Sequence, residues 1–339
     1  MSNVAVIGAG AWGTSLAIVL GRKGTHRVRL WAREKEVLES ASSHRVNELF
    51  LPGHTLPVSA LVTGSLEEAL GGAEIVVSVM PSQHCRHLFE EMRKFLGSGV
   101  MFVSATKGLE EGTLLRMTEV IAMVLRDTGT ESAPRIGALS GPTFAKEVAR
   151  GDPTAISIAS KDTALAETVQ REFSDPGFRV YTNTDVVGVE LGGALKNIIA
   201  IAAGVCDGLG LGHNSVAALI TRGLAEITRL AVACGGRQET MSGLAGLGDL
   251  VLTCTGGLSR NRSVGVELGR GRQLSEIIAG MHGMVAEGVF TTHAAVELAR
   301  VHGVEMPITT QMDAILHQGK PPRDAIRDLM TRSAKSETG

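Results

Sequence analysis

Short apolar runs alternate with amphipathic segments through the first half of the chain. The run Ile75–Val79 is almost continuously apolar, which indicates a strand buried on both faces. Between such runs, apolar residues recur at the spacing of three to four that one face of a helix shows. The pattern predicts a doubly wound, mostly parallel sheet. The expected strands cover residues 3–8, 27–32, 74–80, 100–105, 135–140, 154–160 and 178–182, and the expected helices 12–22, 83–96, 113–127 and 162–173.

The pattern changes after about residue 188, where strand-like runs stop. Within 190–203, Leu191, Leu195 and Ile198 fall on one helical stripe. The second half is therefore predicted to be all-helical. Further helices are expected over residues 215–234, 260–270, 287–302, 307–318 and 322–332. At 339 residues the chain is long enough for about two domains, which we place at 1–188 and 189–333, with a frayed polar tail at 334–339.

Composition and charge exclude several classes of protein. Apolar residues make up 44% of the chain and the net charge is −2, so there is a sizeable core and no basic excess for nucleic acid. No apolar run reaches the length of a membrane span. The four cysteines lie far apart without zinc spacing, so we expect no metal site and a reducing cytoplasm as the location.

The first apolar run leads directly into a glycine-rich motif. Gly8, Gly10 and Gly13 form G-x-G-x-x-G between a predicted strand and a predicted helix. In that setting the first glycine permits a tight turn, the second lets a pyrophosphate approach the backbone, and the third lets helix and strand pack closely. This predicts a Rossmann-type domain that binds a dinucleotide.

The end of the second strand bears on which dinucleotide is bound. An acidic residue usually stands there and binds the ribose hydroxyls, but this sequence has Arg33. A guanidinium can pair with a 2′-phosphate, which favours NADP(H) over NAD(H). The alternative is that Arg33 is simply solvated and Glu34 binds the ribose.

Candidate catalytic residues follow the strands and lie on the later helices. Lys107 follows the strand 100–105 and offers a positive charge, unless it is an ordinary surface lysine. Lys196 lies on an apolar helix beside Gly192 and Gly193, where burial would lower its pKa and a substrate could occupy the space that the glycines leave. The alternative is a lysine that reaches solvent, with the glycines serving helix packing. His213, in a loop without a neighbouring acid in sequence, is the weaker candidate for a general base.

Two later segments could bind substrate. Asp249 is a lone acid among glycines and apolar residues, and could orient Lys196 or simply cap a helix. Ser259, Arg260 and Asn261 begin a predicted helix, where an N-terminus, a guanidinium and an amide together suit a phosphate. Ordinary helix capping by Ser259, with solvated arginines, is the alternative.

Taken together, these segments resemble the bacterial NAD(P)-dependent sn-glycerol-3-phosphate dehydrogenase family. The resemblance runs in order across most of the chain. It rests on G-A-G-A-W-G-T-S-L-A (8–17), L-W-A-R (30–33), S-A-T-K-G-L (104–109), S-G-P-T-F-A-K-E-V (140–148), E-L-G-G-A-L-K-N (190–197), D-G-L-G-L-G-H-N (207–214), G-L-A-G-L-G-D-L (243–250) and S-R-N-R (259–262).

The resemblance implies a Rossmann domain followed by a helical domain, and interconversion of glycerol 3-phosphate and dihydroxyacetone phosphate for phospholipid synthesis. It implies that Lys196 is the catalytic lysine. The implied substrate-binding residues are Lys107, Gly141, Thr143, Lys196, Asn197, Asp249, Ser259, Arg260 and Asn261. The implied cofactor-binding residues are Gly8, Gly10, Ala11, Trp12, Gly13, Arg33, Lys107, Ala145, Arg260, Val285 and Glu287. Ala11 departs from the family, in which many members have serine.

Two other functions are weighed against this one. The first is another dehydrogenase with a Rossmann and a helical domain, acting on a hydroxy acid or a phosphogluconate. The second is a redox-sensing protein that binds a dinucleotide without turnover, although no basic segment of helix-turn-helix size is present. A homodimer is expected to be the functional state.

Overall fold

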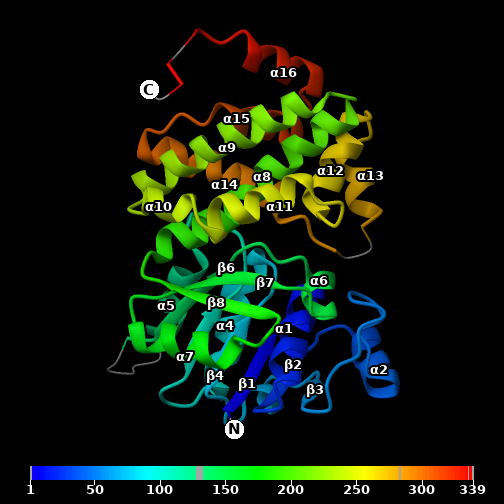
Figure 1. The fold of residues 1–339 in the computed structure, drawn as a ribbon, viewed down its shortest axis with the longest axis vertical. Helices are drawn as coiled ribbons and strands as arrows, with labels where there is room; N and C mark the ends of the chain where they lie inside the picture. Colours follow the sequence, from blue (N-terminus) through cyan, green and yellow to red (C-terminus); the bar gives the residue numbers. More distant parts are fainter. Residues whose placement is uncertain (1, 127–132, 282–283, 335, 338–339) are drawn as a thin grey trace.

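The computed structural model describes residues 2–126, 133–281, 284–334 and 336–337. It has a sheet half, built from the N-terminal residues, and a helical half that lies against one edge of the sheet (Figure 1). The prediction of an α/β fold with a mostly parallel sheet followed by helices is therefore confirmed. Residues 335, 338 and 339 of the expected tail, and residue 127 of an expected helix, lie outside the described residues.

The sheet has eight strands in the order β3-β2-β1-β4-β5-β6-β7-β8. All neighbouring strands are parallel except β6 and β7. Each of the seven predicted strands is present within two residues of its expected bounds. The strands are β1 (Ser2–Ile7), β2 (His26–Trp31), β3 (Ala60–Thr63), β4 (Ile75–Ser78), β5 (Met101–Ser104), β6 (Arg135–Ser140), β7 (Thr154–Ala159) and β8 (Phe178–Asn183).

Helices cover both faces of this sheet. Apolar residues of α1, α6 and α7 pack on one face, and those of α3, α4 and α5 pack on the other. Both sheet faces are therefore buried, which explains the continuous apolar strands. The helices are α1 (Ala11–Arg22), α2 (Lys35–His44), α3 (Leu66–Leu70), α4 (Cys85–Met92), α5 (Met117–Arg126), α6 (Ala145–Arg150) and α7 (Thr163–Phe173).

Four elements of this half are absent from the sequence prediction: β3, α2, α3 and the six-residue helix α6. Strand β3 has only four residues and lies at the sheet edge, where Leu61 is 57% exposed. Helix α2 buries only Val37 and Ala41, and α3 has five residues. Short or mostly exposed elements leave little apolar periodicity to detect.

Two predicted helices of the sheet half have bounds that differ by several residues from those expected. The segment 83–96 contains α4 flanked by two 3-10 turns rather than one helix. The helix predicted from residue 113 begins at Met117, because the residues before it form a loop closed by a bridge between Leu109 and Arg116. Leu114 in this loop has a φ of 61°, which an α-helix does not allow.

The helical half is arranged around α8, which continues directly from the sheet. Helix α8 is long and apolar enough to cross a membrane, but 89% of its apolar window is buried inside the protein. It is thus the core helix of this half. The helices are α8 (Val186–Gly208), α9 (His213–Ala233), α10 (Gln238–Met241), the π-helix η3 (Leu244–Gly248), α11 (Asp249–Thr255), α12 (Arg260–Gly269), α13 (Leu274–Ala279), α14 (Glu287–His302), α15 (Pro307–His317) and α16 (Pro322–Met330).

Glycines bring α8 and α12 into backbone contact. A Cβ atom on Gly204 would lie 2.0 Å from the carbonyl oxygen of Arg262, and one on Gly265 would lie 1.9 Å from that of Ile201. No side chain fits between backbones this close. The N-terminus of α12 is thereby fixed relative to α8, which carries Lys196.

Candidate functional site

The glycine motif forms the turn between β1 and α1. Gly8 has a φ of 114°, and a Cβ atom on Gly13 would lie 1.9 Å from the carbonyl oxygen of Gly8. By contrast, nothing lies within 4 Å of the position that a Cβ atom on Gly10 would take. The first and third glycines are thus required by the backbone, and the second leaves open space above the helix N-terminus. Within the described part of the chain, no side chain caps that N-terminus.

The surroundings of this turn fit a dinucleotide. The backbone N–H groups at the start of α1 favour an anion such as pyrophosphate. The indole Nε1 of Trp12 is a buried donor with no partner among the described residues. Arg33 lies just beyond β2, with its side chain 68% exposed and 3.6 Å from Glu34. Arg33 is therefore free to reach a ligand at the carboxyl end of the sheet.

Asp249 joins two lysines from different halves of the molecule. Its Oδ1 atom lies 2.5 Å from Lys196 Nζ, and its Oδ2 atom lies 2.6 Å from Lys107 Nζ. Lys196 comes from α8 and Lys107 from the loop after β5. The carboxylate is 1% exposed, so this contact is inside the protein. The structure therefore brings Lys107 to the pair of Asp249 and Lys196, which the sequence had already linked.

The burial of Lys196 changes its chemistry. Removal from water lowers the pKa of Lys196 to about 8, with the charge of Lys107 acting in the same direction and Asp249 opposing it. An amine with that pKa is present in both protonation states near neutral pH, as an acid–base catalyst requires. The sequence-based expectation of a lowered pKa is borne out.

Thr253 completes the cluster and was missed in the sequence. Its hydroxyl accepts a hydrogen bond from Lys196 Nζ at 2.6 Å and donates one to the carbonyl oxygen of Asp249 at 2.6 Å. Thr253 follows Asp249 by four residues on α11, so both lie on one helix face. That spacing was the available signal.

The space beside Gly192 and Gly193 is not free for a substrate, contrary to expectation. A Cβ atom on Gly192 would lie 2.6 Å from the carbonyl oxygen of Ala245, and one on Gly193 would lie 2.4 Å from Ser140 Oγ. These glycines serve close packing of α8 against the π-helix and β6. The packing alternative weighed for them is therefore correct.

The loop after β6 contributes backbone rather than side-chain groups. Lys107 Nζ donates to the carbonyl oxygen of Gly141 at 3.0 Å, and the hydroxyl of Thr143 donates to the same oxygen at 3.1 Å. Gly141 has a φ of 155°. Ala145 begins α6, and its carbonyl oxygen accepts a hydrogen bond from Ser15 of α1 at 2.7 Å. This loop thus connects the lysine cluster with the glycine turn.

The start of α12 is organised differently from a simple phosphate cradle. Ser259 caps the helix, since its side chain accepts a hydrogen bond from Arg262 N at 3.2 Å. Asn261 donates to Asn197 Oδ1 and accepts from Gly288 N, both at 2.9 Å, so its amide is already engaged on both sides. Arg260 is exposed, and its side chain forms no hydrogen bond or ion pair with a described residue, although the charge of Glu287 acts on it. Of the three, its side chain is the one free for an anion.

Glu287 joins the helical half to the loop after β4. As the first residue of α14 it accepts hydrogen bonds from Ser82 N at 3.1 Å and Ser82 Oγ at 2.6 Å. Burial raises the pKa of Glu287, and the hydrogen bonds from Ser82 oppose that effect. Val285 precedes this helix and is partly buried. His213, in contrast, is an exposed residue in the first turn of α9.

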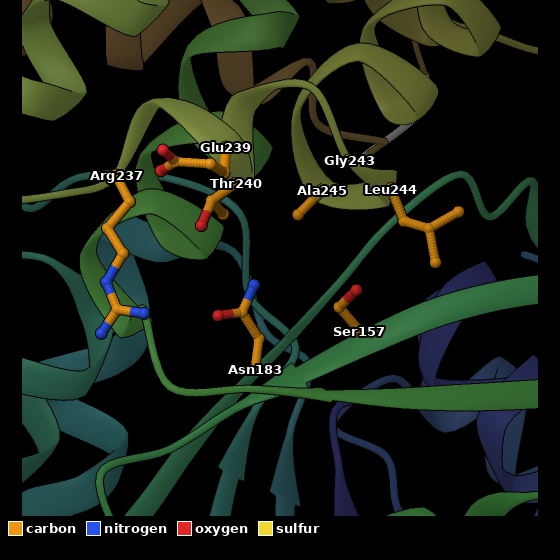
Figure 2. A pocket seen from close by; sticks show the side chains of 8 residues that line it. All are labelled: Ser157, Asn183, Arg237, Glu239, Thr240, Gly243, Leu244 and Ala245. Carbon is orange, nitrogen blue, oxygen red and sulfur yellow. The ribbon is translucent and has the colours of Figure 1, made fainter.

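A separate recess of about 480 Å³ lies between the sheet and the helical half. Figure 2 shows Ser157 and Asn183 on its sheet side, and Arg237, Glu239 and Thr240 on its helical side. None of the predicted site residues lines it. No group of three or more metal-ligating side chains was found in the described part of the chain.

Comparisons with known proteins show which family the chain is similar to. Models of the N-terminus and the C-terminus of NAD-dependent glycerol-3-phosphate dehydrogenase match residues 3–166 and 185–327. A glycerol-3-phosphate dehydrogenase [NAD(P)+] of Koribacter versatilis is 70% identical over 99% of both chains. One of Acidobacterium capsulatum is 55% identical over 99% of this chain and 100% of its own. The crystal structure of glycerol-3-phosphate dehydrogenase from Coxiella burnetii has a TM-score of 0.92 at 41% identity, covering 98% of this chain and 99% of that one.

Proposed function

The chain belongs to the NAD-dependent glycerol-3-phosphate dehydrogenase family, and we propose that Lys196 is the acid–base residue of its reaction. The enzyme is an NAD(P)-dependent glycerol-3-phosphate dehydrogenase, so it interconverts glycerol 3-phosphate and dihydroxyacetone phosphate. The proposal rests on the contact of the Asp249 carboxylate with both lysines. Its oxygens lie 2.5 Å from Lys196 Nζ and 2.6 Å from Lys107 Nζ. When bound, the nicotinamide supplies the hydride acceptor or donor for C2 of the substrate.

Lys196 acts in both directions of this reaction. In oxidation its neutral amine takes the proton of the C2 hydroxyl, while the C2–H bond breaks and a carbonyl forms. In reduction its ammonium returns that proton to the C2 oxygen. Lys107 provides a second positive charge that stabilises negative charge developing on this oxygen. Asp249 and Thr253 fix the direction in which Lys196 Nζ points.

The remaining substrate contacts are assigned to side chains and backbone groups near the lysine cluster, beginning with the side chain that has no partner of its own. Arg260 binds the substrate phosphate, because its guanidinium has no partner among the described residues and stands at a helix N-terminus. Ser259, Gly141 and Thr143 complete the surroundings of the substrate. Asn261 and Asn197 hold α12, α8 and α14 together at this point, so we assign them a role in shaping the site.

The cofactor would be held by residues at the carboxyl ends of the strands. The pyrophosphate would be bound at the turn formed by Gly8, Gly10, Ala11, Trp12 and Gly13. The other residues that would contact the cofactor are Ala145, Val285 and Glu287. Arg33 binds the 2′-phosphate of NADP(H), which makes NADP(H) the preferred cofactor. The exposure of the Arg33 side chain supports this assignment.

The two alternatives from the sequence are not favoured. Both family models and the relatives carry the name of glycerol-3-phosphate dehydrogenase, rather than that of a hydroxy-acid dehydrogenase or a sensor. We further propose domains at 1–188 and 189–333, a homodimer as the functional state, and the cytoplasm as the location. Limited proteolysis and sedimentation of the purified protein test the first two of these.

Steady-state kinetics with dihydroxyacetone phosphate test the assignment of residues. We expect Lys196→Ala to lower kcat by at least about 100-fold, because general acid–base catalysis contributes that much. Arg260→Ala should raise KM for dihydroxyacetone phosphate, with little effect on KM for dihydroxyacetone, which has no phosphate. Near-normal turnover of Lys196→Ala would contradict the role of this lysine, and an unchanged KM in Arg260→Ala would contradict the phosphate site.

A further inference from the structure

Glu190 is a buried carboxylate on α8 with no part in the site described so far. Its relative exposure is 8%, and it faces the beginning of α5 in the sheet half. It accepts hydrogen bonds from Thr118 N at 2.8 Å and Thr118 Oγ1 at 2.6 Å, and its Oε2 atom lies 2.6 Å from Arg116 Nη1. Helix α5 is therefore capped by a carboxylate from the other half of the molecule.

The chain segment that Glu190 holds is the loop that carries Lys107. This loop runs from the end of β5 to Arg116, where the bridge between Leu109 and Arg116 closes it. Hydrogen bonds from Glu110 N to Leu115 O and from Leu114 N to Glu110 O, both 3.0 Å, make it compact. A displacement of Arg116 is thus transmitted to the start of the loop.

The same loop is packed into the helical half at its other end. Leu109 is 2% exposed and belongs to the apolar core around α8, although it lies in the sheet half of the sequence. A Cβ atom on Gly108 would lie 2.5 Å from Ser82 Oγ and 2.9 Å from Glu287 Oε2, so the backbone beside Lys107 is tightly enclosed. Lys107 is therefore placed by contacts with α8 and α14 as much as by β5.

We propose that Glu190 is a positioning residue that fixes the Lys107 loop on α8, and thereby sets Lys107 against Asp249 and Lys196. The proposal rests on the function assigned above to the lysine cluster. Helix α8 then carries both Lys196, which exchanges the proton, and Glu190, whose carboxylate positions Lys107. Movement of the two halves would leave Lys107 with Lys196, because this loop is attached to α8.

A double-mutant cycle tests the proposal. In Glu190→Gln, the amide oxygen can still accept a hydrogen bond from Thr118 N. The side chain is neutral, however, so the ion pair between residue 190 and Arg116 is lost. We expect kcat to fall by about tenfold, since small displacements of a positioned group have effects of this size or more. If Glu190 acts through Lys107, Glu190→Gln should lower kcat little further in a Lys107→Ala background.

The pH profile gives a second readout that a purely structural role would not change. Lys196 is faced by Asp249, Lys107 and Cys254, and the charge of Lys107 lowers the pKa of Lys196. Displacement of Lys107 should therefore move the high-pH limb of dihydroxyacetone phosphate reduction to higher pH. Thermal melts establish that each variant is folded at the assay temperature.

Glu226→Gln is the matched control. Glu226 of α9 is also a buried carboxylate that caps another helix. It accepts hydrogen bonds from Ile308 N at 2.7 Å and Thr309 N at 3.2 Å, at the start of α15. This variant should flatten the pH dependence of unfolding without any shift in the pH profile of turnover. Multiplicative effects of Glu190→Gln and Lys107→Ala, or equal effects of Glu190→Gln and Glu226→Gln on kcat, would overturn the proposal. Unchanged turnover in Lys107→Ala alone would instead overturn the assigned role of Lys107, and this inference with it.

Discussion

Asp249 decides the chemistry of the site, because two cations share its single carboxylate. The positive charge of each lysine offsets part of the free-energy cost of burying the Asp249 carboxylate. The negative charge of Asp249 in turn offsets the repulsion between the two lysines. Lys196 is the more deeply buried of the two cations, with 7% of its side chain exposed against 15% for Lys107. Burial therefore acts mainly on Lys196, and it is this lysine whose pKa falls to about 8.

The direction of this shift predicts opposite pH dependences for the two reaction directions. Oxidation of glycerol 3-phosphate needs neutral Lys196, so its kcat should rise as pH increases through about 8. Reduction of dihydroxyacetone phosphate needs the ammonium, so its kcat should fall over the same range. Initial rates from pH 6 to 10 in a constant-ionic-strength buffer measure both limbs. A pair of profiles with the same sign would contradict the assignment of Lys196.

Arg33 should determine cofactor choice at the residue scale. Arg33→Ala removes a guanidinium that is 68% exposed and makes one long contact of 3.6 Å with Glu34, so stability should change little. We expect KM for NADPH to rise about tenfold or more, because a charge-assisted pair with the 2′-phosphate is lost, and KM for NADH to stay the same. Parallel assays at 340 nm measure both constants. Equal changes for the two cofactors would show that Arg33 does not recognise the 2′-phosphate.

At the scale of elements, the contact between α8 and α12 holds the site together. Gly204 and Gly265 let the two helix backbones touch, and the beginning of α12 carries Arg260 and Asn261. Asn261 then extends the contact to α8 through Asn197 and to α14 through Gly288. The substrate residues of the helical half are thus positioned by helix packing, with no long loop between them.

Gly204→Ala tests this packing. The new methyl group would lie 2.0 Å from the backbone oxygen of Arg262, which cannot rotate away as a side chain would. We expect a loss of about 1 to 3 kcal/mol in the free energy of unfolding, together with a higher KM for dihydroxyacetone phosphate. Gly97→Ala is the control, because nothing lies within 4 Å of its Cβ position. Equal stability of the two variants in urea denaturation would show that the helices can separate without penalty.

At the scale of the whole molecule, buried carboxylates link the pH to the stability of the fold. Glu226 of α9 caps α15 from inside the core, and burial raises its pKa to about 7, with hydrogen bonds from Ile308 and Thr309 opposing that effect. Its folded-state pKa is thus above the unfolded value, so the stabilisation is full below the unfolded pKa. It is lost as pH rises through about 7.

Glu226→Gln should therefore flatten the pH dependence of unfolding. The amide stays neutral, so the variant avoids the wild-type loss between pH 4.5 and 7, which amounts to up to about 3 kcal/mol. Thermal or urea unfolding at several pH values measures the difference between variant and wild type. Glu48→Gln, at an exposed position, is the control and should follow the wild type. Parallel curves for Glu226→Gln and the wild type would contradict the raised pKa.

The sequence by itself determined what depends on local spacing. The apolar runs and helical stripes indicated the mostly parallel sheet and the longer helices after residue 188, but not the short elements α10, η3, α11 and α13. The spacing of Gly8, Gly10 and Gly13 indicated their separate roles in the turn, because each role depends on the backbone within a few residues. Elements with few buried residues, such as β3 and α2, escaped detection for the same reason, since their signal is weak.

Only the tertiary structure decided how the candidate residues act together. Lys107 and Asp249 are 142 residues apart in the chain and 2.6 Å apart in space, and no local pattern encodes that distance. The fold likewise showed that the space beside Gly192 and Gly193 is filled by packing, that Asn261 is hydrogen-bonded to Asn197, and that Glu190 pairs with Arg116. Burial, which sets the pKa of Lys196, is a property of everything packed around a side chain, and so it is fixed only when the two halves meet.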